Sequence, residues 1–266
     1  MKKVYAVTAL APGLMIGCMD VETRVIVNAD GSGTIQETFL MKNEFAEEMK
    51  KSKAEGGQDA TDAKMYKEQE LRDKAADYGK DVSFVSVGDF ANATHQGYRA
   101  VYAFRDVTKL TINQNMKAKS GQNAGKPAPA ENIIFRFAKK PVPTLTLIMP
   151  EKKKDPAEKR QAEKPEDDAQ IEQQIKQMRL IFDGMRFALV VQVNGEITKT
   201  NAANVNGNTI TLFDIEFSKF LDNTEKLKEL NAKKPATMEE TKALLKDVPG
   251  LVIETGKRVS VSFKGK

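Results

Sequence analysis

Two residues that could do chemistry occur only once in this 266-residue chain, Cys18 and His95. A single cysteine excludes a disulfide framework and any multi-cysteine zinc or iron–sulfur site. A single histidine leaves a Ser-His-Asp triad only one base, and it excludes a histidine-rich metal site. His95 lies in the polar segment ANATHQG between two expected strands, where a solvated loop histidine is the simpler interpretation. We therefore predict no metal site and no cofactor.

The carboxylates give no clear acid–base site. Adjacent pairs occur at 47–48, 167–168 and 239–240, all in charged helical or loop contexts. Acid–base catalysis needs a carboxyl group raised from an apolar cleft. Glu37, flanked on its strand face by Ile35 and Phe39, is the best candidate for a buried carboxylate, and an exposed position at a strand edge is the favoured alternative. Known nucleophile and kinase-loop motifs are missing from the sequence. We predict no catalytic residues and no enzymatic activity.

The residues before Cys18 give that cysteine a specific role. The lysines at 2–3 form a positively charged N-terminal region, and residues 4–16 form a mostly apolar stretch that is too short to span a bilayer. The sequence Leu-Met-Ile-Gly-Cys resembles a bacterial lipobox, although Met15 stands where leucine is usual. The resemblance implies a diacylglyceryl group on the Cys18 thiol and cleavage by a lipoprotein signal peptidase between Gly17 and Cys18.

We therefore expect a signal peptide at 1–17 and an ectodomain at 18–266, held by lipid on the extracytoplasmic face of a membrane of the bacterial cell envelope. One acyl chain binds a membrane marginally, whereas two or three anchor a protein stably. Strand signals begin at Val21, so almost no linker separates the domain from the membrane surface. The net charge of +5 is too small to indicate nucleic acid. The expected partner is the membrane, reached through Cys18.

Alternation of apolar residues dominates the rest of the chain. It predicts strands at 21–28, 34–41, 81–90, 97–107, 132–138, 144–149, 186–193, 196–205, 208–217 and 257–263. Helices are predicted at 43–79 with a Gly-Gly break, at 169–185, and at 223–247 with a break at Pro235. Polar composition predicts flexible loops at 115–131 and 151–168. The predicted class is α+β, an antiparallel sheet of hairpins and meanders with helices packed on one face.

Turn residues predict where the hairpins close. The segment from Asp30 to Gly33 predicts a tight turn rather than a phosphate loop, because no Lys-Ser/Thr and no helix follow it. Asn-Gly pairs at 194–195 and 206–207 predict the two turns of a meander. The apolar face switches near Phe213, which predicts a bulge. The Asn201 side chain is expected to fix a strand bend by bonding nearby backbone.

The lipobox, the Asp-Gly-Ser-Gly turn and the polar helix that follows resemble the LppM-domain bacterial lipoproteins. A second match lies in 195–212, at Gly195, Ile197, Thr200, Asn201, Ala202, Val205, Gly207, Asn208 and Thr211. The resemblance covers the two ends of the ectodomain, and residues 108–168 are unmatched. It implies an α+β ectodomain without assigned catalytic residues. It also implies binding of an envelope lipid or glycolipid in an apolar cavity.

Three functions remain open from the sequence. The first is a non-enzymatic, membrane-anchored module that binds a lipid-like ligand or an envelope partner. The second is a structural or assembly lipoprotein, which docks a protein through a sheet edge or the helix at 169–185 and has no ligand pocket. The third and minor one is an envelope hydrolase. A concave apolar cavity would favour the first, a filled core with an exposed apolar patch the second, and a polar cleft that includes His95 the third.

Overall fold

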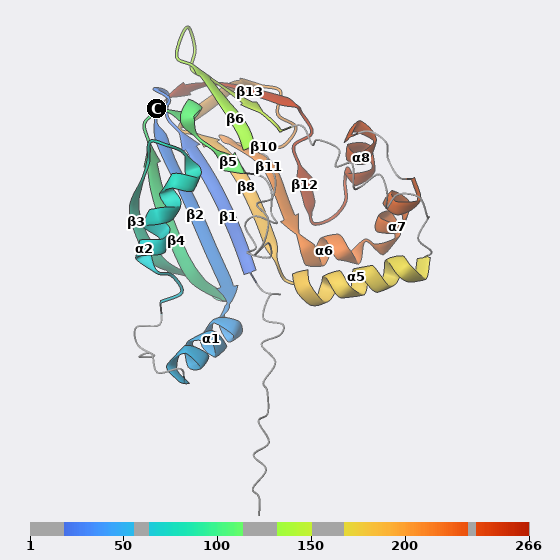
Figure 1. The fold of residues 1–266 in the computed structure, drawn as a ribbon. Coiled ribbons are helices and arrows are strands. Elements are labelled where there is room, and N and C mark those ends of the chain that lie inside the picture. The colour runs from blue at the N-terminus through green and yellow to red at the C-terminus, as the bar shows by residue number, and fades with distance from the viewer. Residues whose placement is uncertain (1–18, 56–63, 114–131, 151–167, 234–237, 266) are drawn as a thin grey trace, which may run out of the picture.

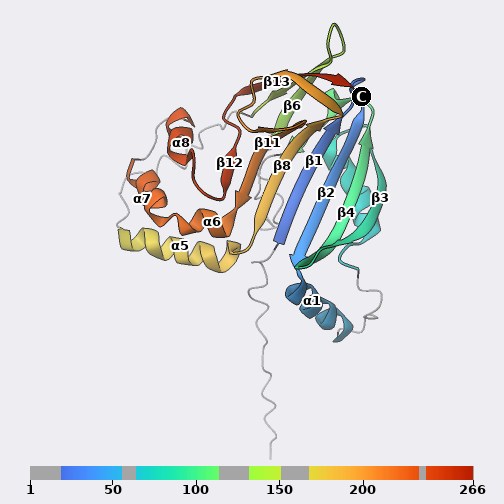
Figure 2. The same ribbon diagram turned by 180° about the vertical axis from the view of Figure 1, so that it is seen from behind.

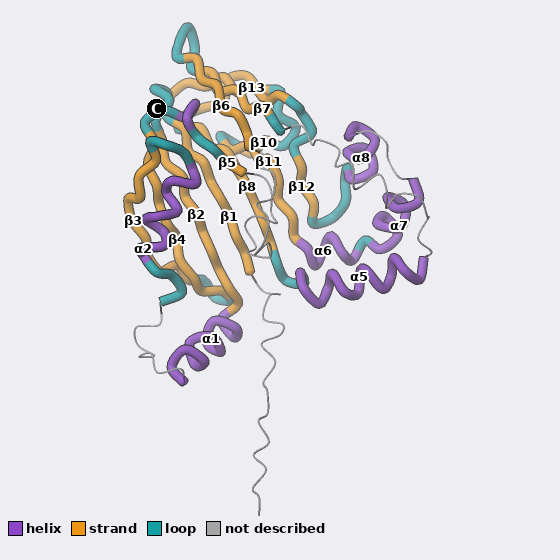
Figure 3. Tube along the Cα trace, viewed as in Figure 1, coloured by secondary structure: helices purple, strands orange, loops and turns teal. Residues whose placement is uncertain are grey.

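A computed structural model describes residues 19–55, 64–113, 132–150, 168–233 and 238–265. The signal-peptide and lipobox predictions, including Gly17 and Cys18, lie outside the described residues. So do the loop predicted at 115–131, nearly all of the loop predicted at 151–168, and the break at Pro235. In the described ranges the α+β class is confirmed, with two β-sheets and six α-helices (Figure 3).

The larger sheet, called the main sheet, has the strand order β10-β11-β8-β1-β2-β4-β3, and β12 pairs with β11. Its strands are β1 (Met19–Val27), β2 (Gly33–Lys42), β3 (Val82–Ala91), β4 (His95–Phe104), β8 (Arg186–Val193), β10 (Val205–Asn206), β11 (Thr209–Glu216) and β12 (Leu251–Ile253). The small sheet has the order β5-β6-β7-β13-β9. It consists of β5 (Ile112–Asn113), β6 (Asn132–Ala138), β7 (Thr144–Ile148), β9 (Gly195–Thr200) and β13 (Arg258–Gly265).

The helices connect and flank these sheets. They are α1 (Asn43–Glu55), α2 (Glu68–Lys74), α5 (Asp168–Phe182), α6 (Phe217–Asp222), α7 (Thr224–Lys233) and α8 (Met238–Leu245). A 3-10 turn at Ala75–Tyr78 continues α2, and its Tyr78 packs into the core. The predicted helices at 169–185 and 223–247 are thus confirmed in outline, and α6 and β12 are additional elements.

The prediction of one antiparallel sheet of meanders is corrected in two respects. The strands divide between two sheets, and β1 pairs in parallel with β8, with Val21 opposite Phe187 and Val27 opposite Val193. The predicted hairpin at Asn194-Gly195 is wrong, because β8 belongs to the main sheet and β9 to the small sheet. Gly195 is buried there, and a Cβ atom would collide with the carbonyl oxygen of Lys264. Close backbone approach, not a turn, therefore explains this glycine.

The other turns lie at or next to their predicted positions. The hairpin of β10 and β11 turns one residue later than predicted, at Gly207 and Asn208, because Asn206 pairs with Thr209. Gly207 has a φ of +59°, in the left-handed region that glycine adopts easily. The pairing of β11 with β8 shifts register between Thr211 and Phe213, where the bulge was expected. The Asp30 carboxylate accepts hydrogen bonds from the backbone N–H and the hydroxyl of Ser32, which makes the first hairpin a tight turn.

The two faces of the main sheet differ. Its inner face packs against the small sheet and α2 to form one apolar core. Figures 1 and 2 show the small sheet over the end where β1 finishes, while β1 begins at the opposite end, beside α1 and the end of α5 that leads into β8. Under the small sheet and the 3-10 turn after α2, Val25, Ile35, Val191 and Tyr102 are all 0% exposed. The small sheet therefore closes only one half of the inner face.

Candidate functional site

A continuous row of apolar side chains crosses the half of the inner face that the small sheet leaves uncovered, and we call it the open row. Residues directly opposite each other in paired strands point to the same face of a sheet. Successive pairings join Leu251 to Ile215, Phe187, Val21, Phe39 and Tyr98, from β12 across to β4. Phe187 is buried, and the other five are half-buried. The open row thus runs across six neighbouring strands.

Aromatic contacts support the open row at two places. Phe39 and Tyr98 stack with their ring centroids 5.4 Å apart, and the Tyr66 ring makes a tilted contact with Tyr98 at the same centroid distance. On β8, in the middle of the row, Phe187 meets Phe217 of α6 edge-on, with 6.1 Å between the centroids. Such pairs contribute roughly 0.5–1.5 kcal/mol each beyond their buried area. The row is therefore a packed aromatic and aliphatic surface, able to contact an apolar ligand.

Glu37 lies on the inner face next to the open row, one strand position further into the core than Phe39. It is 4% exposed and lies on β2, between β1 and β4. The favoured alternative of an exposed glutamate at a strand edge is therefore wrong. The carboxylate accepts a hydrogen bond from the Tyr78 hydroxyl, and Lys74 Nζ lies 2.6 Å from Glu37 Oε1. The cluster of Glu37, Lys74, Tyr78, Tyr98 and Tyr102 is here called the tyrosine cluster.

The tyrosine cluster contains one buried polar atom without a partner. Burial and the negative charge of Glu37 raise the pKa of Tyr78 well above its usual value, and the same causes raise the pKa values of Tyr98 and Tyr102. The Tyr102 ring packs against Tyr78, with 5.0 Å between centroids, but its hydroxyl is buried and makes no hydrogen bond. Glu37 is thus paired, whereas the Tyr102 hydroxyl is not.

The raised tyrosine pKa values predict loss of stability in alkaline solution. Near neutral pH, the three phenols are protonated in both the folded and the unfolded state. Above about pH 10, the unfolded chain loses these protons while the folded protein keeps them, so stability falls as pH rises further. The chain from Cys18 onward has four tyrosines. In a pH titration followed by phenolate absorbance, we expect three of them to ionise only as the circular dichroism signal of the fold disappears. Smooth ionisation of all four in the folded protein would contradict this.

The other residues considered from the sequence do not join this cluster. His95 is the first residue of β4 rather than part of a loop, and its Nδ1 lies 2.8 Å from the Thr94 hydroxyl. Glu47 is exposed and contacts Lys50 and Gln96. Within the ranges that the structure describes, no group of three or more His, Cys, Asp or Glu residues could hold a metal ion. Among those same residues, no helix is long and apolar enough to cross a membrane.

Asn201 bonds backbone, as predicted, but the backbone belongs to β13 and not to its own strand. Its Oδ1 accepts a hydrogen bond of 2.7 Å from the Ser260 backbone N–H, and its Nδ2 donates one of 3.0 Å to the Arg258 carbonyl oxygen. Asn208 similarly donates to the carbonyl oxygen of Val193. The matched segment 195–212 therefore secures strand ends by bonding backbone groups.

Replacing Asn201 with alanine should loosen the end of β9 from β13. Because the site is exposed and water can replace both hydrogen bonds, we expect Asn201→Ala to lower the free energy of unfolding by about 1 kcal/mol. Urea denaturation would measure the loss, with the exposed Lys199→Ala on the same strand as a control that changes little. A loss no larger than that of the control would contradict the assigned role.

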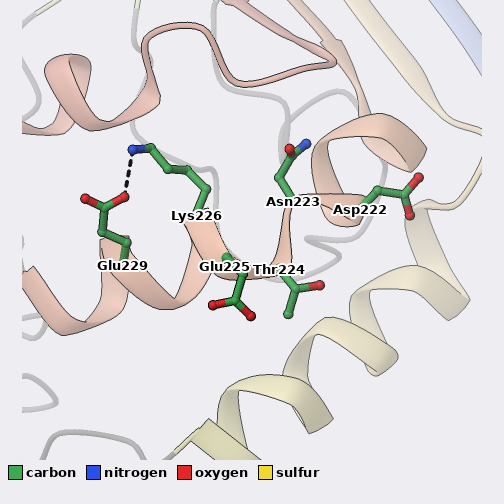
Figure 4. A pocket seen from close by; sticks show the side chains of 6 residues that line it. All are labelled: Asp222, Asn223, Thr224, Glu225, Lys226 and Glu229. Atoms are coloured by element: carbon green, nitrogen blue, oxygen red, sulfur yellow. Dashed lines mark hydrogen bonds and ion pairs between the residues drawn. The ribbon is translucent and has the colours of Figure 1, made fainter.

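A hollow of about 420 Å³ lies elsewhere, at the junction of α6 and α7 (Figure 4). The residues around it are all polar or charged and present no large apolar side chain: Asp222, Asn223, Thr224, Glu225, Lys226 and Glu229. Lys226 pairs with Glu229 at 2.7 Å within this lining. The hollow is therefore not the apolar cavity that the family resemblance implied, and the open row is the better candidate for an apolar ligand.

Comparison with known proteins assigns no family. No family model and no curated protein matches the sequence. Among solved structures, the NMR structure of the folded domain of Mycobacterium tuberculosis LppM aligns with 94% of this chain and 91% of its own. The identity is 8% and the TM-score is 0.32. Similarity at that level does not establish a common fold, so the site must be interpreted from its own residues.

The sequence predicts the strands that carry most of these side chains, but it does not predict that the side chains lie together in one row. Val21, Phe39, Tyr98, Phe187 and Ile215 all lie on predicted strands, where alternation gives each a face. Leu251 belongs to a three-residue strand, which is too short for the periodic signal. Nothing in local alternation tells which strands are neighbours, so a row that crosses six strands has no signal in the sequence.

Proposed function

We propose that this chain is a membrane-anchored lipoprotein of the bacterial cell envelope, and that its ectodomain binds a lipid acyl chain along the open row without catalysing a reaction. The observation that supports the proposal most is the uneven burial of the inner face. Apolar residues are fully buried under the small sheet, whereas five of the six residues of the open row are only half-buried. Incompletely buried, contiguous apolar surface is typical of ligand, membrane and protein contact sites, and the expected anchor at Cys18, three residues before Val21, favours a lipid as the occupant.

The chemistry of the open row suits an amphiphile. Each methylene group that leaves water contributes about 0.8 kcal/mol, so six would contribute roughly 5 kcal/mol before the cost of association. Tyr98 ends the row beside Glu37 and Lys74, and the Lys74 side chain is 38% exposed. The site therefore combines an apolar track with polar groups at one end, as binding of a lipid chain and its head group requires.

Lipid binding can be tested on the chain from Cys18 to Lys266, which contains every described element. Native mass spectrometry after mixing with phosphatidylethanolamine and phosphatidylglycerol should show retained lipid mass. Val21→Gln places an amide in the open row, and burying it against an acyl chain should weaken binding about tenfold. Ile26→Gln on the outer face of the same strand is the matched control. Bare protein throughout, or equal losses in both variants, would contradict the proposal.

The lipid anchor is a separate part of the proposal, and it rests on the lipobox-like sequence at Cys18. Metabolic labelling with radioactive fatty acid should label the wild-type chain and leave Cys18→Ala both unlabelled and unprocessed. The Cys18→Ala ectodomain should still bind lipid, because the open row does not include Cys18. Labelling that survives the substitution would exclude a lipid anchor on Cys18. It would leave the proposed binding of lipid by the open row unaffected.

The alternative of a docking lipoprotein is favoured by a different feature, the free edge of the main sheet. Among the described strands β3 pairs only with β4, and its exposed Val85 lies at a bulge in that pairing. An unpaired strand edge can accept a strand from a partner. Failure of lipid binding together with protection of the β3 amides from hydrogen exchange by an envelope protein would favour this second function.

A further inference from the structure

We infer that the open row faces the membrane that holds Cys18, and that its lipid enters directly from that bilayer instead of crossing water. This inference rests on the proposed function and adds the source of the ligand and the direction from which it enters. The structural reason is that the half of the inner face outside the small sheet lies at the end of the main sheet where β1 begins.

The distance from the anchor to the open row is short. The β1 strand begins at Met19, directly after Cys18, so no linker separates the anchor position from the sheet. Val21 follows three residues after Cys18, which is about 10 Å of extended chain. The polar layer of a bilayer is roughly 6 Å thick on each side. Val21, the first residue of the open row along the chain, thus lies just outside the layer of lipid head groups.

The orientation of the domain is fixed because β1 is an interior strand. All nine of its residues pair with β2 and eight of them pair with β8. Near the start of the strand, Arg186 of β8 contacts the Asp20 carboxylate at 3.1 Å. A strand held on both sides cannot peel away to act as a flexible linker. The end of the main sheet that carries the open row therefore stays at the membrane.

The gradient of burial gives the direction of entry. Along β1 the inner-face residues Met19 and Val21 are half-buried, whereas Val25 and Val27 are 0% exposed. Val27 lies about 30 Å from Cys18 along the extended strand, under the small sheet. An acyl chain can therefore reach the inner face from the anchor end, while the far end is closed by packed side chains.

The orientation can be tested by reversing it. Cys18 is the single cysteine of the chain from residue 18 to 266, so it can be coupled to a maleimide lipid in phosphatidylethanolamine–phosphatidylglycerol vesicles. The reversed variant combines Cys18→Ser with Lys266→Cys, next to the end of β13 at the far end of the sheet. The vesicles carry a phospholipid with a photoactivatable acyl chain, and mass spectrometry maps the cross-linked residues after illumination.

With the native attachment, cross-links should concentrate on Val21, Phe39 and Ile215. Reversed attachment should reduce them about tenfold, because the local concentration of acyl chains at the open row falls. A water-dispersed photoactivatable fatty acid should label the open row equally in both proteins. Equal labelling of the open row from the vesicles in both attachments would overturn the inference and leave the proposed function intact. Failure of the dispersed fatty acid to label the open row in either protein would overturn both.

Discussion

Tyr78→Phe should lower the free energy of unfolding by about 2 kcal/mol, whereas Tyr102→Phe should leave it unchanged or raise it slightly. The two residues are a matched pair, since both rings are buried, they contact each other, and both lie beside the Glu37 carboxylate. The Tyr78 hydroxyl donates a hydrogen bond to that buried carboxylate, and hydrogen bonds to charged groups contribute roughly 1.5–3 kcal/mol. The Tyr102 hydroxyl has no partner, so its removal relieves a buried, unsatisfied polar group.

Urea denaturation at neutral pH would measure both effects, because each variant removes one oxygen atom and preserves the ring. The difference between the two variants is the informative quantity, since any general effect of losing a hydroxyl from this part of the core cancels. Equal losses for the two variants would mean that the Tyr78 hydroxyl contributes nothing specific to holding Glu37. A larger loss for Tyr102→Phe would mean that a buried water molecule bonds that hydroxyl.

Local signals in the sequence predicted the strands but not their partners. Alternation located β2, β8 and β11 within one residue and β4 within three, because a strand with one buried face must repeat every two residues. The parallel pairing of β1 with β8 joins segments more than 150 residues apart, and no turn residue marks it. The Asn194-Gly195 pair even indicated a false hairpin, because a glycine selected for close backbone approach resembles a turn glycine.

The same limit explains the candidate site. The sequence identified Glu37 as a candidate buried carboxylate, since its neighbours on the strand face are apolar, but it did not place β2 between two other strands. The partners of Glu37 lie 37 and 41 residues away, in α2 and the 3-10 turn that continues it. Whether a strand residue is covered or open depends on the second sheet. The uneven burial that defines the open row is therefore a tertiary property.

Arg186→Met should lower the free energy of unfolding by about 2 kcal/mol, because Arg186 joins three strands through an ion-pair network on the outer face. Its guanidinium makes two hydrogen bonds to Asp214 of β11, at 2.9 and 2.7 Å, and contacts Asp20 of β1 at 3.1 Å. Without the guanidinium, Asp20, Glu22 and Asp214 would remain as three carboxylates without their shared cation. The side chain is 30% exposed, so water screens part of the repulsion and the loss stays below that of a fully buried pair.

The pH dependence of that loss identifies its electrostatic origin. Burial raises the pKa of Asp20, and the charge of Arg186 acts against the increase. In Arg186→Met the pKa of Asp20 should rise further, so the folded variant holds a proton that the unfolded chain releases. A group with a raised pKa in the folded state stabilises the fold at low pH and loses that effect as pH rises through its pKa. The deficit relative to wild type should therefore shrink as pH is lowered from 7 toward the usual pKa of aspartate.

Urea denaturation of both proteins across this pH range would measure the deficit. Arg24→Met is the matched control, because Arg24 pairs with one carboxylate, Glu22 at 2.7 Å, and also bonds the Gln192 side chain. We expect the control to lose about 1 kcal/mol, with a much weaker dependence on pH. A deficit for Arg186→Met that stays constant or grows at lower pH would mean that Arg186 stabilises the fold through its methylene groups and not through the charge of its guanidinium. The pairing of β1 with β8 would then depend on apolar contacts rather than on charge.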